Sequence, residues 1–448
     1  MPVPDPARRV VVLALLFTAT FALLAGCGGG GSAGSPYLAP PPPAAKGKYF
    51  THVVILVQEN RTFDNLFATF PGADGATRGK THNGGSIRLK ESTLASPISP
   101  NNGYNFWRRD WNGGKMNGFD TVPIGRMSGT YVYRYVDPTQ IAPYWDLAKQ
   151  YVLADHTFQT QGSGSFTAHQ DLIRGGTEIG SGESLIDFPT AEPWGCNAPP
   201  ATRTSLISVS NKYSVFTGPF PCMSYETLAD LLDKSAVSWR YYTPAAGTIG
   251  GNLWNAFAAI HAVRLGADWS NVVSPETDVF TDISRGTLPS VAWVIPDFHN
   301  SDHPGQSSDT GPSWVAQVVD AIGASDAWKT TAILIVWDDW GGWYDHVAPP
   351  GNRRYGGLGF RVPFIAVSPY AKAGYVSHYQ YEFGSIVRFL EDNWNLGRLG
   401  TTDVTSSDFA NDFFDFSQTP RAFVRIGSEY SKSYLLRRPP SNQPVDTE

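Results

Sequence analysis

The sequence predicts an α/β protein in which a mostly parallel central sheet is sandwiched by helices. Short apolar runs rich in β-branched residues alternate with helical patterns, an alternation typical of parallel sheets. One run, at 332–337, is apolar throughout, as expected for a strand that is buried on both faces. A chain of 448 residues is long enough for one large α/β domain or for two smaller ones.

The individual elements follow from periodicity. We expect strands at 52–57, 291–295, 332–337 and 362–368, and helices at 225–234, 313–322 and 382–393. Ser224 is a candidate cap for the first of these helices. The stretches at 72–140 and 180–287 contain fewer strand signals and more Trp, Tyr, Gly and Pro. We therefore expect a domain at 49–420 in which these two stretches form cap insertions, followed by a C-terminal tail at 421–448.

The N-terminal segment predicts export. Two arginines precede an apolar run at 10–24 that is long enough for the core of a signal peptide and short for a membrane span. The run ends in Leu24-Ala25-Gly26-Cys27, which is similar to the lipobox of bacterial lipoproteins, where the cysteine receives a lipid. We expect 1–27 to be a lipoprotein signal peptide and 28–48 to be a flexible linker that ties a periplasmic or cell-surface domain to the envelope membrane. An ordinary secretory signal is the alternative.

Charge and cysteine content exclude some functions. The chain has 34 Lys and Arg against 40 Asp and Glu, a formal charge of −6, which argues against nucleic acid as a partner because such binding requires clustered positive charge. Cys196 and Cys222 lie in a chain expected to be exported, so a disulfide is the favoured interpretation. A zinc site is the alternative, but neither a C-x-x-C spacing nor a nearby histidine supports it.

Polar side chains directly follow three of the expected strands. Glu59 and Asn60 follow the first strand, Asp338 and Asp339 follow the third, and an Asp- and His-containing segment at 297–303 follows the second. Open α/β sheets bind ligands beyond the carboxyl ends of their strands, so we expect these clusters to meet at one edge. Carboxylate and amide oxygens suit a hard divalent metal. A single acidic pair is more often a solvated or capping feature, but its position at a strand end favours a metal site.

Ser165 is the candidate nucleophile. It lies in the segment GSGSFTAH at 162–169, where glycines permit close approach to a ligand. The helical pattern that follows places backbone N–H groups and the positive end of a helix dipole beside the serine, an arrangement that favours bound phosphate. An N-cap role is the alternative for this serine, and Ser163 and Thr167 are nearby alternative nucleophiles.

Four segments carry a resemblance to a known family. They are HVVILVQENRTFD at 52–64, WNGGKMNGF at 111–119, VWDDWGGWYDHV at 336–347 and RVPFIAVSP at 361–369. Together they resemble the bacterial phosphoesterases that include non-specific phospholipase C and a class of acid phosphatases, within the alkaline phosphatase superfamily. The resemblance extends over 50–418, nearly all of the expected mature chain.

The resemblance implies an alkaline phosphatase-like fold and metal-dependent hydrolysis of phosphate esters through a phosphoseryl intermediate. One divalent ion is implied, with Ca²⁺, Mg²⁺, Mn²⁺ and Zn²⁺ all open as its identity. Ser165 would be both a ligand of this ion and the nucleophile. The other implied ligands are Glu59, Asn60, Asp338 and Asp339.

Histidines complete the implied site. His303 matches a family histidine that faces the phosphate and protonates the leaving group. His169, one helical turn after Ser165, is a candidate for contact with the same phosphate, with a packed, hydrogen-bonded histidine as the alternative. Trp340 and Phe383 stand where many relatives have histidine.

The substrate class has two candidates. Family phospholipases tend to carry threonine as nucleophile, so Ser165 favours hydrolysis of small phosphomonoesters, as in acid phosphatases. The alternative is cleavage of phospholipid diesters next to the headgroup, as phospholipase C does. A non-catalytic surface lipoprotein that binds ligands on the same fold is a further alternative, disfavoured by the complete ligand set.

Overall fold

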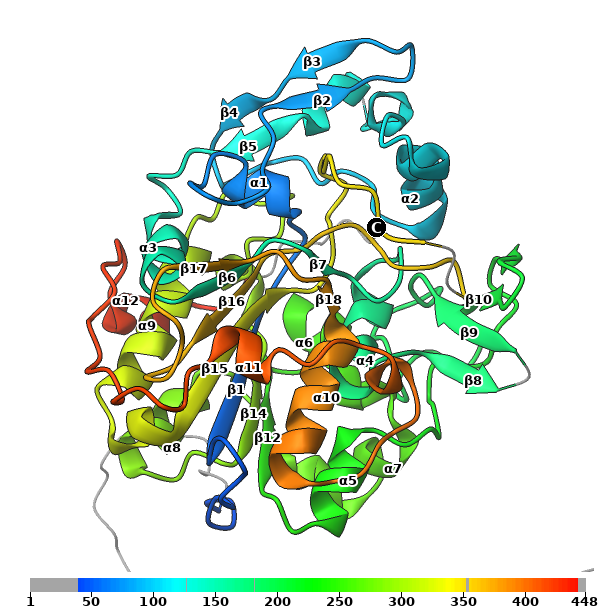
Figure 1. The fold of residues 1–448 in the computed structure, drawn as a ribbon. Helices are drawn as coiled ribbons and strands as arrows, with labels where there is room; N and C mark the ends of the chain where they lie inside the picture. The colour runs from blue at the N-terminus through cyan, green and yellow to red at the C-terminus, as the bar shows by residue number, and fades with distance from the viewer. Residues whose placement is uncertain (1–38, 126, 181, 352–353, 442–448) are drawn as a thin grey trace, which may run out of the picture. The chain divides into compact units, whose positions relative to one another are not determined.

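An eight-stranded sheet forms the centre of the fold (Figure 1), with the strand order β13-β12-β14-β1-β15-β16-β6-β17. Seven strands are parallel, and β16 alone is antiparallel to its neighbours β15 and β6. In sheet order the strands are β13 (Val272–Val273), β12 (Trp239–Tyr242), β14 (Val291–Val294), β1 (His52–Gln58), β15 (Thr331–Trp337), β16 (Phe364–Val367), β6 (Val152–Ala154) and β17 (Tyr375–Ser377).

Helices cover both faces of the sheet. Figure 1 shows α3 (Ala142–Gln150), α8 (Asp278–Arg285) and α9 (Gly311–Gly323) on one face, and α4 (Ser165–Arg174), α5 (Leu228–Lys234) and α10 (Phe383–Trp394) on the other. The predicted α/β fold is therefore confirmed. Further short elements are α1 (Phe63–Phe67), α6 (Ile249–Leu253), α7 (His261–Arg264), α11 (Ala410–Phe413), α12 (Lys432–Arg437) and the strand pair β7 (Thr157–Phe158) and β18 (Tyr381–Glu382).

This computed structural model describes residues 39–125, 127–180, 182–351 and 354–441. The predicted signal peptide and lipobox, and most of the predicted linker, lie outside the described residues. No helix within the described ranges is long and apolar enough to cross a membrane.

The centre of the sheet brings two parts of the chain together that are far apart in sequence. All seven residues of β15 are buried, as its continuous apolarity predicted. The register pairs Gln58 of β1 with Trp337 of β15. The residues that follow, Glu59 and Asp338, therefore leave the sheet side by side at its carboxyl edge.

The predicted helices form with shifted ends. α5 begins at Leu228 instead of 225, and its N-cap is Thr227, not Ser224. Thr227 and Asp230 form a capping box, in which each side chain hydrogen-bonds to the backbone of the other residue. This reciprocal pair satisfies the free N–H groups of the first turn, so the helix starts later than periodicity alone suggests.

The first predicted insertion lies beyond the carboxyl ends of the main strands (Figure 1). It contains α2 (Tyr104–Trp111) and two small two-stranded sheets, formed by β2 (Arg78–Lys80) with β3 (Ser86–Arg88) and by β4 (Lys90–Ser92) with β5 (Arg134–Val136). A second buried cluster, distinct from the main core, joins its Trp107, Phe119 and Tyr133 to Trp340 and Phe360. The insertion is thus packed directly on the segment that follows β15.

The second predicted insertion differs from expectation in its later part. Its first part supplies β11 (Tyr213–Ser214), β10 (Ser205–Ser208) and β9 (Glu183–Ile186) to a separate sheet, whose fourth strand, β8 (Glu178–Gly180), ends where the predicted insertion begins. Its later part supplies β12 and β13 to one edge of the main sheet. The Trp and Tyr residues of β12 (WRYY), which suggested irregular structure, favour strands because large rings pack well on a pleated surface.

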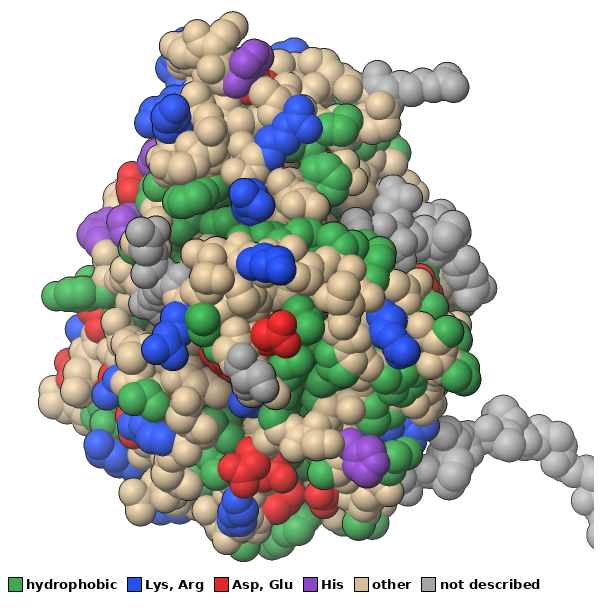
Figure 2. Space-filling view, turned by 90° about the vertical axis from the view of Figure 1, so that its right-hand side faces the viewer, with side chains coloured by type: hydrophobic (Ala, Val, Ile, Leu, Met, Phe, Trp, Pro, Cys, Tyr) green, Lys and Arg blue, Asp and Glu red, His purple; other side chains and the backbone are tan. Residues whose placement is uncertain are grey.

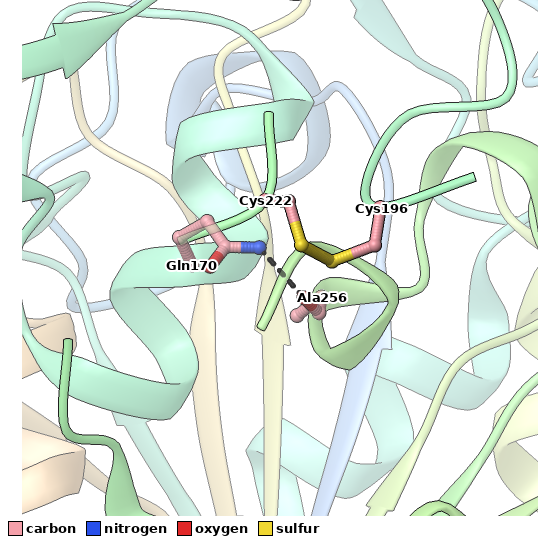
Figure 3. Close-up of a disulfide and its surroundings, with 4 residues drawn as sticks. All are labelled: Gln170, Cys196, Cys222 and Ala256. Carbon is pink, nitrogen blue, oxygen red and sulfur yellow. Dashed lines mark hydrogen bonds between the residues drawn. A yellow bond between two sulfur atoms is a disulfide. The ribbon is translucent and has the colours of Figure 1, made fainter. Parts of the chain in front are cut away.

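The predicted disulfide between Cys196 and Cys222 is confirmed (Figure 3). It lies beside α4, where Gln170 donates a hydrogen bond from Nε2 to the carbonyl oxygen of Ala256, 2.9 Å away. The N–H of Cys196 donates to the oxygen of Ala258 in the same short segment, at 2.8 Å. The disulfide and this segment therefore brace the helix that carries Ser165.

The segment expected as a tail includes α12 and is attached to α9. The N–H of Ile426 donates to Asp320 Oδ1 at 2.8 Å, and the N–H of Tyr430 donates to Ser313 Oγ at 3.1 Å. The chain therefore stays ordered beyond residue 421 because its polar groups find partners on α9.

Candidate metal centre and nucleophile

The two acidic pairs meet at the carboxyl edge between β1 and β15. The N–H groups of Asn60 and Asp339 both donate to Asp338 Oδ1, at 2.9 and 2.6 Å. Asn60 adopts a left-handed backbone conformation (φ 59°), which asparagine tolerates better than most residues. The turn after β1 is thus hydrogen-bonded to the first acid after β15, and the sequence-predicted convergence of the two pairs is observed.

Helix α4 brings Ser165 and His169 to the same place. The Ser165 hydroxyl donates to Asp339 Oδ2 at 3.0 Å and approaches Glu59 Oε2 at 3.4 Å. His169 Nε2 lies 2.9 Å from Glu59 Oε1 and 3.7 Å from Asp338 Oδ2. One helix turn therefore places a hydroxyl and an imidazole against three carboxylates.

The local sequence explains why Ser165 starts the helix. The N-cap is Gly164, with an extended backbone, and Ser165 is the first helical residue, so it is not itself the cap. A Cβ on Gly162 would lie 2.3 Å from Cδ2 of Trp107, so this loop passes the indole ring at a distance only glycine permits. The other two candidate hydroxyls are engaged elsewhere: Ser163 Oγ accepts from the N–H of Asp187 at 2.7 Å, and Thr167 donates to the oxygen of Gly164 at 3.2 Å.

The electrostatics of the cluster favour a bound cation. Glu59, Asp338 and Asp339 are fully buried, and Asn60 is 1% exposed. Burial, followed by the neighbouring charge of Glu59, raises the pKa of Asp338 well above its usual range. Asp338 Oδ2 has no hydrogen-bond partner among the described residues.

These donors fit a hard divalent ion. Buried carboxylates so close together are costly unless a positive charge compensates them. Ligand atoms of Glu59, His169 and Asp338 lie within 4.8 Å of one another, and the oxygens of Ser165 and Asp339 adjoin them. The oxygen-rich set suits Ca²⁺, Mg²⁺ or Mn²⁺, and the imidazole keeps Zn²⁺ open.

Comparison with known proteins then assigns the family. The model of the Phosphoesterase family matches residues 50–397. The chain belongs to this family. The resemblance predicted from the four sequence motifs is thereby confirmed.

Two relatives are phospholipases. The chain is 26% identical over 422 residues to the non-hemolytic phospholipase C of Pseudomonas aeruginosa, an alignment that covers 80% of this chain and 57% of the relative. It is 24% identical over 434 residues to phospholipase C B of Mycobacterium tuberculosis, with 82% of this chain and 78% of the relative covered. The chain therefore spans just over half the length of the Pseudomonas protein. A solved structure of a protein in the alkaline phosphatase superfamily from Vibrio parahaemolyticus matches with a TM-score of 0.38 and 11% identity, covering 83% of this chain and 73% of that one.

His303 lies under the same edge of the sheet. The N–H of Glu59 donates to the oxygen of Ser301, two residues earlier, at 2.8 Å. The His303 ring packs against Trp254 and Phe298, with centroid distances of 5.8 and 5.3 Å, and its Nδ1 is hydrogen-bonded to the oxygen of Pro304. Burial lowers the pKa of His303 to about 4, so the neutral imidazole prevails at neutral pH.

Trp340 and Phe383 replace expected histidines with packing groups. Trp340 is fully buried against Phe119 and Phe360, and its Nε1–H donates to the oxygen of Asn102 at 3.2 Å. Phe383 is the first residue of α10 and belongs to the main core. Both positions contribute apolar area instead of a titratable ring.

Asn102 is a residue at the site that sequence reasoning missed. Its Nδ2 donates to Asp339 Oδ1 at 2.8 Å, and its side chain is fully buried. It lies in a loop of the first insertion, without the strand-end position that singled out the acidic pairs. Neither spacing nor periodicity carried a signal for it.

A second polar cluster adjoins the site but holds its own cation. Ligand atoms of Asp64, Asp345 and His346 lie within 4.8 Å of one another. The guanidinium of Arg361 hydrogen-bonds to both carboxylates, with Nε 2.9 Å from Asp345 Oδ1 and Nη2 3.2 Å from Asp64 Oδ1. Arg361 therefore supplies the positive charge that a metal would provide, and the cluster braces the segment after the acidic motif.

The proposed ligands are closed off from solvent in this structure. A cleft of about 190 Å³ lies between α2 of the first insertion, which lines it with Tyr104, Trp107, Arg108 and Trp111, and residues of the segment 349–358. Trp107 contacts Gly162, three residues before Ser165.

Figure 2 shows a band of hydrophobic side chains across one face of the molecule, with single Lys and Arg side chains around it.

Proposed function

We propose that this protein is a metal-dependent hydrolase of phosphate esters in which Ser165 is the nucleophile. The observation that carries the proposal is the direct contact of the Ser165 hydroxyl with Asp339, 3.0 Å away, inside a buried set of carboxylates. A divalent ion held by Glu59, Asn60, Ser165, Asp338 and Asp339 would supply positive charge for the transferred phosphoryl group and lower the pKa of the serine.

The protein groups suggest the order of proton and bond changes. Asp339 Oδ2 accepts the proton of the Ser165 hydroxyl, and the serine oxygen attacks phosphorus in line with the ester oxygen. The P–O bond to the alcohol breaks and a phosphoserine forms. The leaving oxygen takes a proton from water at neutral pH, where His303 is neutral, and from protonated His303 at acidic pH. Water then hydrolyses the phosphoserine, which restores the serine and releases phosphate.

The start of α4 supports this role for Ser165. The helix has ten residues and begins at the serine, so the positive end of the helix dipole lies beside the hydroxyl and favours phosphate there. His169 lies on the next turn, against Glu59. We propose that it orients this carboxylate and contacts the same phosphate.

Two substrate classes follow from different observations. A serine at the nucleophile position favours phosphomonoesters, as in the acid phosphatase branch of the family. The two relatives named above are phospholipases C, which favours phospholipid diesters as a second candidate. The export and lipid anchoring predicted from residues 1–27 would place either activity at a membrane surface.

The test is Ser165→Ala assayed on an aryl phosphate and on a phosphocholine ester, each with and without added divalent metal. We expect turnover to fall by at least about 10³-fold while the fold is retained, because the attacking oxygen is lost. Thr167→Ala is the matched control: its hydroxyl donates to the oxygen of Gly164 at the start of the same helix, so activity should stay within a few-fold of wild type. Full activity of Ser165→Ala would refute the role of the serine, and a metal-independent or inactive wild type would refute the proposed function.

A further inference from the structure

Asn102 connects the first insertion to the candidate metal centre. It lies 237 residues before Asp339 in sequence, yet its Nδ2–H donates to Asp339 Oδ1 over 2.8 Å. Both side chains are fully buried. A hydrogen bond from an amide to a carboxylate is charge-assisted, and water does not compete with it in a buried position.

The two oxygens of Asp339 have different partners. Oδ1 accepts from Asn102 and from the N–H of Gly341, at 2.8 and 2.7 Å. Oδ2 accepts from the hydroxyl of Ser165. Two donors on Oδ1 fix the rotation of the carboxylate about its Cβ–Cγ bond, and this rotation directs Oδ2 at the nucleophile.

The loop that carries Asn102 is held close to the acidic motif. The oxygen of Asn102 accepts from Trp340 Nε1 at 3.2 Å. Gly342 adopts a left-handed conformation (φ 73°), and a Cβ there would lie 2.7 Å from the oxygen of Asn101. The backbones of these two segments are therefore in direct contact, and Asn102 cannot withdraw from Asp339 without separating them.

The chemistry of the site sets the orientation of the Asn102 amide. A flipped amide would place its oxygen against the carboxylate of Asp339, where two acceptors repel. In the observed orientation Oδ1 of Asn102 has no hydrogen-bond partner among the described residues. Leaving a buried acceptor unpaired costs free energy, and a residue without this oxygen would avoid the cost. The donated hydrogen bond to Asp339 therefore explains an asparagine at this position better than packing alone does.

We propose that Asn102 is a positioning residue that orients Asp339 for metal binding and for contact with Ser165. This inference rests on the proposed function, because it takes Asp339 to be a metal ligand. Because Asn102 belongs to the first insertion, Asp339 is held in this orientation only when the insertion is packed on the carboxyl edge of the sheet.

The experiment compares Asn102→Leu with Asn101→Leu in otherwise unchanged protein. Leucine branches at Cγ as asparagine does but lacks the donor. Asn101 is the matched control, since its side chain donates to the oxygen of Pro123, within the insertion. Chelator-treated protein is titrated with Mn²⁺, Ca²⁺, Mg²⁺ or Zn²⁺, one at a time, by calorimetry. We expect Asn102→Leu to weaken the tightest metal about 10- to 100-fold, the usual effect of losing a partner of a ligand, and Asn101→Leu to stay within about twofold of wild type.

Thermal unfolding with and without the same ion separates positioning from simple packing. A positioning residue reduces the increase in Tm produced by the metal, whereas a packing residue lowers the Tm of both forms equally. If Asn102→Leu does not fold, Asn102→Ala is measured in the same way. Wild-type metal affinity and a wild-type metal-induced increase in Tm in the Asn102 variant would overturn the inference.

Failure of this inference differs from failure of the proposed function. If the wild type binds metal and hydrolyses phosphate esters while the Asn102 variants behave identically, only the role of Asn102 is wrong. If the wild type binds none of the four ions, both proposals are overturned. If it binds metal without turnover, the metal affinities still decide the role of Asn102.

Discussion

Replacement of Arg361 by methionine tests whether the cluster beside the site depends on an internal cation. The guanidinium is fully buried and bonds Asp345 through Nε at 2.9 Å and Asp64 through Nη2 at 3.2 Å. Its Nη1 also donates to the backbone oxygens of Asp74 and Asp155, both at 2.8 Å. Methionine retains much of the side-chain volume but leaves these acceptors without their donor.

The magnitude follows from the buried charges. Removing one partner of a buried ion pair costs about 3–5 kcal/mol, because the remaining carboxylates are left uncompensated. A domain typically has only about 5–15 kcal/mol of stability in total, so the loss is large but compatible with a folded variant. Burial, followed by the charge of Asp345, already raises the pKa of Asp64 in the wild type, and loss of Arg361 raises it further.

The sign of the pH dependence follows from that shift. The penalty belongs to the ionised carboxylate, so it is fully present above the folded-state pKa of Asp64 and is lost as pH falls through it. Urea unfolding at pH 7 and at pH 5 should therefore show a smaller difference between Arg361→Met and wild type at the lower pH. Arg425→Met is the control: its side chain is 80% exposed and pairs with Asp320 at 3.2 Å, so it should cost less than about 1 kcal/mol. Two results would contradict the reasoning. One is a loss of unfolding free energy in Arg361→Met that is smaller than in the control at pH 7. The other is a difference between Arg361→Met and wild type that is as large at pH 5 as at pH 7.

Two further predictions concern stability. Burial, then the charge of Asp297, raises the pKa of Glu276 from 4.5 to about 8, so the folded state holds a proton that the unfolded state has lost between these values. The free energy of unfolding should fall by roughly 5 kcal/mol as pH rises through this window. Glu276→Gln should remove this pH dependence in denaturant titrations, and an unchanged pH dependence would exclude Glu276 as its source. Replacing Cys196 and Cys222 together by serine opens a loop with a sequence separation of 26. It should lower the free energy of unfolding by about 3 kcal/mol, because the unfolded chain gains conformational freedom. An unchanged denaturation midpoint would show that the contacts around the disulfide hold this region without it.

The central sheet was predictable because a strand that is buried on both faces has apolar residues at nearly every position. The run at 332–337 is apolar throughout and becomes β15, the neighbour of β1. Strand ends then indicated where Glu59 and Asp338 would meet. The aromatic strand β12 was missed because Trp and Tyr occur in loops and strands alike, and only its pairing with β14 distinguishes the two.

The sequence by itself determined the class of fold, the family and the two acidic pairs, because these depend on local pattern and on motifs that are continuous in the chain. The family resemblance implied Ser165, but local pattern could not separate it from Ser163 and Thr167, and only the tertiary structure shows which of these hydroxyls contacts the acids. It also decided that Asn102 bonds to Asp339 and that Arg361 fills the second acidic cluster. Asn102 and Asp339, like Arg361 and Asp64, are more than 200 residues apart in sequence. Such pairs meet only through the packing of the whole domain, so no local sequence pattern predicts them.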